Sequence, residues 1–133
     1  MNAQVERGFV AVLAPFMAGV HVREATSSKP HPADVQMVIV ACPDCEHVAG
    51  PLHRATVKIY LGTPAFDVSE ARHRDAAGMV AMALIDPAGA KVAFDAAAGG
   101  LALHGFHVRS QSEDIVENSW RSTIEIVVGL RVG

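Results

Sequence analysis

Both cysteines of the chain lie in a six-residue segment that also carries two carboxylates and a histidine, Cys42-Pro43-Asp44-Cys45-Glu46-His47. Thiolate and imidazole are ligands that zinc prefers, and a Cys-x-x-Cys pair supplies half of a four-ligand structural site. The other half would have to come from His47, His53, or the distant His104 and His107. Because His104 and His107 lie three residues apart on an expected strand, they are predicted to face opposite sides of a sheet, which disfavours joint ligation.

The same pair of cysteines allows a redox interpretation. In thioredoxin-like proteins an apolar strand runs into a Cys-x-x-Cys motif at a helix N-terminus, and the helix dipole lowers the pKa of the first thiol. Here Gly50 and Pro51 follow the motif closely and would break such a helix at once. The favoured interpretation is a turn, since Pro43-Asp44 suits the central positions of a β-turn. We therefore predict no metal and no cofactor, with Cys42, Cys45 and His47 kept as a zinc or redox alternative.

The rest of the sequence contains no persuasive catalytic set. Glu113, Asp114 and Glu117 are typical of a solvated acidic loop, and His73 of the exposed face of a helix. No Gly-x-Ser-x-Gly elbow occurs, and Gly99-Gly100 lacks the strand–glycine–helix context of a phosphate-binding loop. These patterns indicate a protein that is not an enzyme.

Composition narrows the class of protein further. The 133 residues are best explained as a single domain over 1–133. Eleven Lys and Arg against fourteen Asp and Glu give a formal charge of −3, and there is no basic block. The electrostatic footprint of a nucleic-acid binder is therefore absent. No apolar run reaches the ~18 residues of a membrane span, so neither nucleic acid nor membrane is expected as a partner.

The first half of the chain predicts a helix, a loop and two strands. Apolar residues recur at helical spacing over 3–20, with Glu6 and Arg7 off the stripe, and Pro15 is expected to bend or end this helix. The polar segment 23–34 contains two prolines and is typical of a loop. Residues 35–41 and 54–62 have strand patterns, joined by a twelve-residue connection, 42–53.

The second half predicts two helices and two strands. Asp67 and Glu70 have the spacing of a capping pair at the start of a helix that ends near Leu84. Asp86-Pro87 starts a short helix, about 87–98, which Gly99-Gly100 closes. Residues 101–109 predict a strand, and 110–118 a loop in which Ile115 and Val116 could extend a hairpin arm.

The clearest strand covers residues 119–132, where side chains alternate strictly between two faces. One face holds Trp120, Ser122, Ile124, Ile126, Val128, Leu130 and Val132. The element order is therefore α-β-β-α-α-β-β. It predicts an α+β fold with a mostly antiparallel four-stranded sheet and helices packed on one face.

This element order resembles that of the tail-terminator or tail-completion (minor tail) proteins of long-tailed bacteriophages and prophage-derived particles. The most specific parts are the strand-Gly-Thr-Pro junction at 57–64 and the Trp-Arg-x-Thr strand from residue 120. The resemblance covers nearly the whole chain, whereas the Cys-Pro-Asp-Cys segment does not belong to the pattern.

The resemblance implies a structural protein that caps the tail tube as a ring, typically a hexamer. Its partners would be further copies of itself, the tail tube protein, and the head–tail connector or a neck protein. It would be located in the virion tail or neck after assembly in the host cytoplasm. Alternatives stay open: a neck or tail-tube-related structural protein, a small dimeric α+β binding domain, or a zinc or redox protein.

Charge and position suggest which residues would form the ring. The strand 119–132 would pair across subunits if it lay at a sheet edge. Basic residues of one subunit would face acidic residues of the next and set the register. The expected interface residues are Arg54, Lys58, Tyr60, Glu113, Asp114, Glu117, Trp120 and Arg121.

Overall fold

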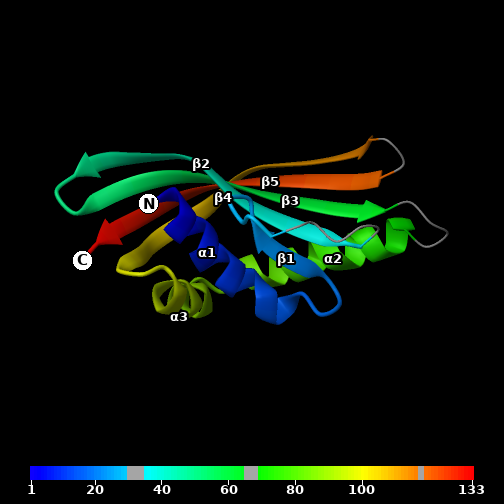
Figure 1. The fold of residues 1–133 in the computed structure, drawn as a ribbon, viewed down its shortest axis with the longest axis horizontal. Helices are drawn as coiled ribbons and strands as arrows, with labels where there is room; N and C mark the ends of the chain where they lie inside the picture. Colours follow the sequence, from blue (N-terminus) through cyan, green and yellow to red (C-terminus); the bar gives the residue numbers. More distant parts are fainter. Residues whose placement is uncertain (30–34, 65–68, 117–118) are drawn as a thin grey trace.

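One mixed β-sheet forms a layer of the molecule, and helices cover one of its faces (Figure 1). This is a computed structural model that describes residues 1–29, 35–64, 69–116 and 119–133. Its elements are α1 (Asn2–Leu13), the 3-10 helix η1 (Ala14–Phe16), β1 (His21–Glu24), β2 (Met37–Ala49), β3 (Leu52–Pro64), α2 (Ser69–Leu84), α3 (Pro87–Ala97), β4 (Leu101–Val116) and β5 (Ser119–Val132).

The strand order in the sheet is β1-β2-β3-β5-β4. All neighbouring strands are antiparallel except β1, which runs parallel to β2 at one edge. The predicted α+β class is confirmed, but the prediction of four antiparallel strands is wrong because β1 was not expected. This strand has only four residues and no apolar alternation. It forms because the chain that follows η1 lies alongside β2, where its backbone can pair with that strand.

The first helix is shorter than the predicted 3–20. It ends at Leu13 and continues as the 3-10 turn Ala14–Phe16. Pro15 explains the break, because proline lacks a backbone donor and its ring crowds the preceding turn. Glu6, expected outside the apolar stripe, is only 2% exposed.

The helices of the second half lie close to where the sequence places them. α2 begins at Ser69, and the predicted capping residue Asp67 lies outside the described residues. Asp86 has the extended backbone of an N-cap and Pro87 occupies the first turn of α3, although the Asp86 side chain makes no capping hydrogen bond. Gly99 and Gly100 close the helix with φ values of 59° and 96°.

Two strands run further than their sequence patterns predicted. β2 continues through Cys42–Cys45 to Ala49, so the predicted turn at Pro43-Asp44 is wrong and the reversal occurs at Gly50-Pro51. A register shift between Ala41 and Asp44 marks a β-bulge, which accommodates a proline that cannot donate to the ladder. β4 likewise extends to Val116 through the segment predicted as a loop.

The core lies between the sheet and the helices. Inward-facing aliphatic residues of β2, β3 and β5 pack against α1, α2 and α3. Phe9 of α1 and Phe94 of α3 are the largest fully buried side chains, with ring centroids 5.3 Å apart. All three α-helices of the described chain contribute buried residues to this core, so the opposite face of the sheet is left open.

Candidate interaction surfaces

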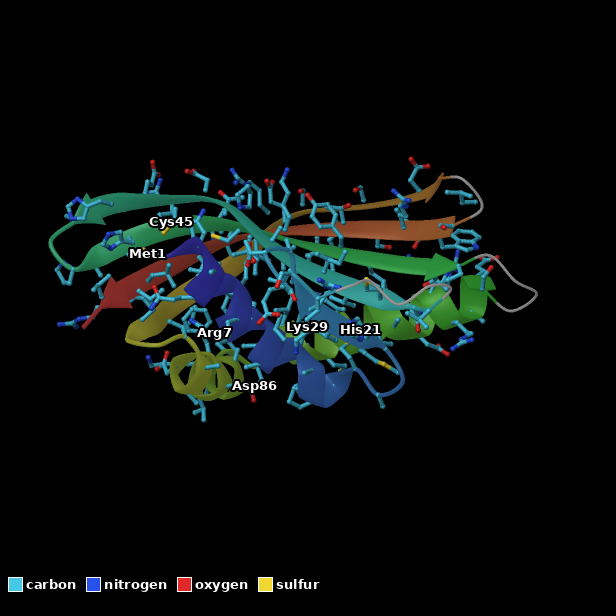
Figure 2. The ribbon with its side chains drawn as sticks, viewed as in Figure 1. Met1, Arg7, His21, Lys29, Cys45 and Asp86 are labelled. Carbon is cyan, nitrogen blue, oxygen red and sulfur yellow. The ribbon has the colours of Figure 1, made fainter. Side chains whose placement is uncertain are left out.

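The outer face of the sheet, which no described helix covers, carries polar and charged side chains. Residues of β3 and β5 alternate between the core and this face. Arg54, Lys58 and Tyr60 therefore project from β3, and Arg121 from β5, on the same side. Figure 2 shows the row of side chains that stands on this face, away from the helices. Four predicted interface residues thus share one surface.

The acidic half of the predicted interface is divided between the two faces. Asp114 pairs with Arg121 across β4 and β5 and so lies on the outer face. Glu113 pairs instead with Ser122, which faces α2. Glu117 lies outside the described residues. The expected cluster of three carboxylates is therefore not a single surface.

Trp120 was expected at the interface, but the structure places it on the helix side. Its Nε1 donates a hydrogen bond to Ser69 Oγ at 3.0 Å. Its ring lies against that of His73, with centroids 6.2 Å apart. Trp120 is half-buried and helps to fix the start of α2 on the sheet.

Some charges of the outer face are already paired within the chain, and others are not. Arg109 Nε lies 3.2 Å from Glu125 Oε2, and Arg54 Nη1 lies 3.5 Å from Glu46 Oε1. In the described part of the chain, Lys58 and Arg121 have no carboxylate within salt-bridge distance. Among the described residues these two cations therefore have no ion-pair partner.

A groove of about 510 Å³ crosses the outer face beside Arg121. Its apolar side is formed by Val35, Ile39 and Tyr60, and Gly62 lies at its floor. A Cβ on Gly62 would meet no atom within 4 Å, so the groove is open above this residue. The groove combines apolar side chains with a positive charge that has no ion-pair partner among the described residues.

The long strand β5 does not lie at a sheet edge, which was the condition for its pairing across subunits. It lies between β3 and β4 and is hydrogen-bonded to both. Pairing of residues 119–132 across subunits is therefore excluded in this fold. The edges of the described sheet are the short β1 and the sixteen-residue β4.

A bulge in β4 corrects the predicted geometry of two histidines. The register shifts between Leu103 and Gly105, so His104 is an extra residue. A Cβ on the outward-facing Gly129 would lie 3.7 Å from His104 Cβ, and His107 pairs with the outward-facing Val127. Both histidines thus lie on the outer face, not on opposite faces.

The cysteines lie where their thiolate forms are disfavoured. Burial, the neighbouring Cys45 and the charge of Glu6 raise the pKa of Cys42 to about 12. Burial also raises the pKa of Cys45, and both thiols are free. Within the ranges that the structure describes, no group of three or more His, Cys, Asp or Glu is placed to hold a metal ion. The geometry gives the zinc or redox alternative no support, because both chemistries need a thiolate.

His73, predicted on the exposed face of a helix, is fully buried beneath α2. Its Nδ1 lies 2.8 Å from Thr63 Oγ1 and its Nε2 lies 2.6 Å from Ser122 Oγ. Gln36 Nε2 donates to the same Thr63 hydroxyl at 2.9 Å. The signal missed in the sequence is the spacing of His73 from Ala76 and Val80, which places all three on one helical stripe.

This buried cluster satisfies its own polar groups. Burial lowers the pKa of His73, while the charge of Glu113 opposes that shift, so the imidazole is neutral at pH 7. Serine beside histidine is the pairing of hydrolase triads, but here a threonine hydroxyl occupies the place of the orienting carboxylate. The cluster joins α2 to β3 and β5.

The helix layer also exposes apolar side chains. α2 and α3 meet at 86°, and near this corner Met82, Ile85 and Val92 are 58%, 74% and 73% exposed. None of the described helices is by itself long and apolar enough to cross a membrane. The bent pair α2 and α3 passes the same test of length and composition only when the two helices are taken together. Clustered exposed apolar side chains are typical of interaction sites.

No protein-family model matches this chain, and no curated protein matches its sequence. Among solved structures, the chain is similar to one in a structure described as the virion of a native gene transfer agent (GTA) particle. The TM-score is 0.60 at 18% sequence identity, and the match covers 98% of this chain and 95% of that chain. The two chains share a fold along nearly their whole length.

Proposed function

We propose that this chain is a structural protein of a phage-like virion, without enzymatic activity. The observation that carries the proposal is the fold shared with a chain of the gene transfer agent virion over nearly the whole of both chains. The sequence resemblance to tail-completion proteins, which rests on residues 57–64 and the strand from Trp120, points to the same class independently.

Within that class, the role we propose is a tail terminator that caps the tail tube as a ring of six copies. Its further partners are the tail tube protein and the head–tail connector or a neck protein. A subunit of a ring needs contacts with neighbours on more than one side. The open sheet face and the apolar corner of α2 and α3 are two such surfaces.

The roles of the expected interface residues are revised accordingly. Lys58, Tyr60, Asp114 and Arg121 stay as contact residues, because they share the outer face. Arg54 is a weaker candidate, since Glu46 of its own chain already pairs with it. Trp120 is reassigned to the packing of α2 on the sheet, and Glu113 is set aside because it lies on the helix side of the sheet.

The test of the ring is the assembly state of the purified chain. We expect native mass spectrometry to show a closed oligomer of six copies, and negative-stain electron microscopy to show rings with a central opening. A chain that stays monomeric at every concentration, or stops at a two-fold dimer, contradicts the ring.

Position in the virion needs a second experiment. Gold-labelled protein is added to tail tubes that lack a cap, and we expect label at a single end of each tube. Label along the whole tube wall, or none on the tubes, contradicts the terminator role. An unrelated ring-forming protein that carries the same gold label is the control for non-specific binding.

A further inference from the structure

We propose that the corner between α2 and α3 of one copy seats in the outer-face groove of the next copy. This inference rests on the proposed ring, and it names the two surfaces that close it. The corner consists of Met82, Ile85, Asp86 and Val92. The groove is lined by Val35, Ile39, Tyr60, Gly62 and Arg121 among others.

The corner exposes apolar side chains on both sides of the helix junction. α2 and α3 turn by 86° at their junction, and Met82 and Ile85 lie just before the turn. Their exposed side chains, with that of Val92, are left in water by a fold that has already buried Phe94 and Ala90 from the same region. Burial of such side chains stabilises a contact by about 25 cal/mol for each Å² of apolar surface removed from water.

The groove is concave and has a matching chemical character. Val35 and Tyr60 are exposed apolar side chains, and Gly62 leaves the floor empty. Above Gly62, an inserted side chain therefore meets an apolar wall without displacing an atom of the described residues. A groove of about 510 Å³ lies within the range of natural binding pockets, roughly 300–1,000 Å³.

Each surface carries one unpaired charge, and the two charges have opposite sign. Asp86 is exposed and its carboxylate makes neither a capping hydrogen bond nor an ion pair with any described residue. Arg121 borders the groove and also lacks a salt-bridge partner in the described chain. When the corner of one copy sits in the groove of the next, the Asp86 carboxylate comes close to the Arg121 guanidinium. This attraction favours one relative position of the two copies over others.

The positions of the two surfaces decide the kind of assembly. Figure 2 places Asp86 in the helix layer on the side away from the sheet, whereas the groove lies on the opposite, open face of the sheet. The contact therefore joins two different surfaces of the same chain. After one such heterologous contact, one copy keeps a free corner and the other a free groove, so further copies add head to tail. The assembly closes into a ring when the rotation between copies closes, and grows as an open filament when it does not.

Two variants, each with one disabled surface, test the inference. Ile85→Arg places a charge on the corner at a 74% exposed position, so the fold is retained. Gly62→Gln fills the groove from a strand position with open space above it. Each variant is studied alone and in an equimolar mixture by native mass spectrometry, with circular dichroism as the check on folding.

We expect each variant to be monomeric alone and the mixture to form a 1:1 dimer, because one intact corner and one intact groove remain. A mixture that stays monomeric overturns the inference. A Gly62→Gln variant that dimerises alone also overturns the inference, because two intact corners would then meet each other in a two-fold contact. If both variants still form the ring that the wild-type chain forms, this interface is wrong but the ring proposal stands. A wild-type chain that is monomeric overturns both proposals.

Discussion

At the scale of single residues, the buried carboxylate of Glu6 joins three segments. Oε1 accepts hydrogen bonds from Thr26 N at 3.1 Å and Thr26 Oγ1 at 2.7 Å, and Oε2 accepts one from Cys42 N at 3.0 Å. Glu6→Ala would leave the buried Cys42 amide without its acceptor, at a cost of about 2–3 kcal/mol of unfolding free energy. Urea unfolding measures the loss.

The matched control for Glu6 is Glu70→Ala. Glu70 is exposed, and its ion-pair partner among the described residues is Arg74, one helical turn away at 3.0 Å. Such surface pairs contribute at most about 0.5 kcal/mol. Equal losses from the two variants would mean that the Glu6 hydrogen bonds do not stabilise the contact between α1, β1 and β2.

His73 makes a specific contribution to the pH dependence of stability. Burial lowers its pKa in the folded state below the usual 6.5, so the unfolded chain takes up a proton at higher pH than the folded chain does. Stability is therefore full above pH 6.5, falls as the pH drops through 6.5, and levels off below the folded pKa. Urea midpoints between pH 8 and pH 5 are expected to fall less steeply in His73→Gln than in the wild type, and equal slopes in the two proteins would contradict this contribution of His73.

At the scale of elements, one glycine sets the distance between α1 and α3. A Cβ on Gly8 would lie less than 2.5 Å from the ring of Phe94, which is fully buried and cannot move aside. Gly8→Ala is expected to lower the unfolding free energy by about 1–3 kcal/mol through overpacking. Gly78→Ala in α2 meets no atom within 4 Å and should raise it by up to about 1 kcal/mol. Thermal melts at one protein concentration measure both, and a stabilised Gly8→Ala contradicts the close approach.

The elements predicted close to their true ranges are those whose position follows from the pattern of their own residues. β5 and the later helices carry strict periodicity and end signals, and they lie close to the predicted ranges. The Cys-Pro-Asp-Cys segment was misjudged because its local preference is a turn, while the facing residues of β3 supply a ladder that holds it extended with a bulge. β1 has no pattern of its own and depends on hydrogen bonds to the neighbouring segment of the chain, such as His21 N to Gln36 O at 3.0 Å.

At the scale of the whole molecule, sequence identifies charges but not the surface on which each one lies. Glu113 and Asp114 are adjacent, and as loop residues they were expected on one surface. In a strand neighbours point to opposite faces, so one faces α2 and the other faces solvent. The groove beside Arg121 could not be predicted at all, because it is formed by β2, β3 and β5 in an order that only the sheet topology defines.

Two arginines on the outer face test which part of that face the assembly buries. Arg121 lies beside the groove and has no ion-pair partner among the described residues, whereas Arg54 already pairs with Glu46 toward the β2–β3 turn. In the proposed ring, Arg121→Glu would place a carboxylate against Asp86 of the neighbouring copy and should weaken each contact by about 100-fold, or about 3 kcal/mol. Arg54→Glu should leave the ring intact in native mass spectrometry. The double variant Arg121→Glu with Asp86→Lys restores opposite charges and should restore the ring, whereas an unchanged ring in Arg121→Glu alone would place the interface elsewhere.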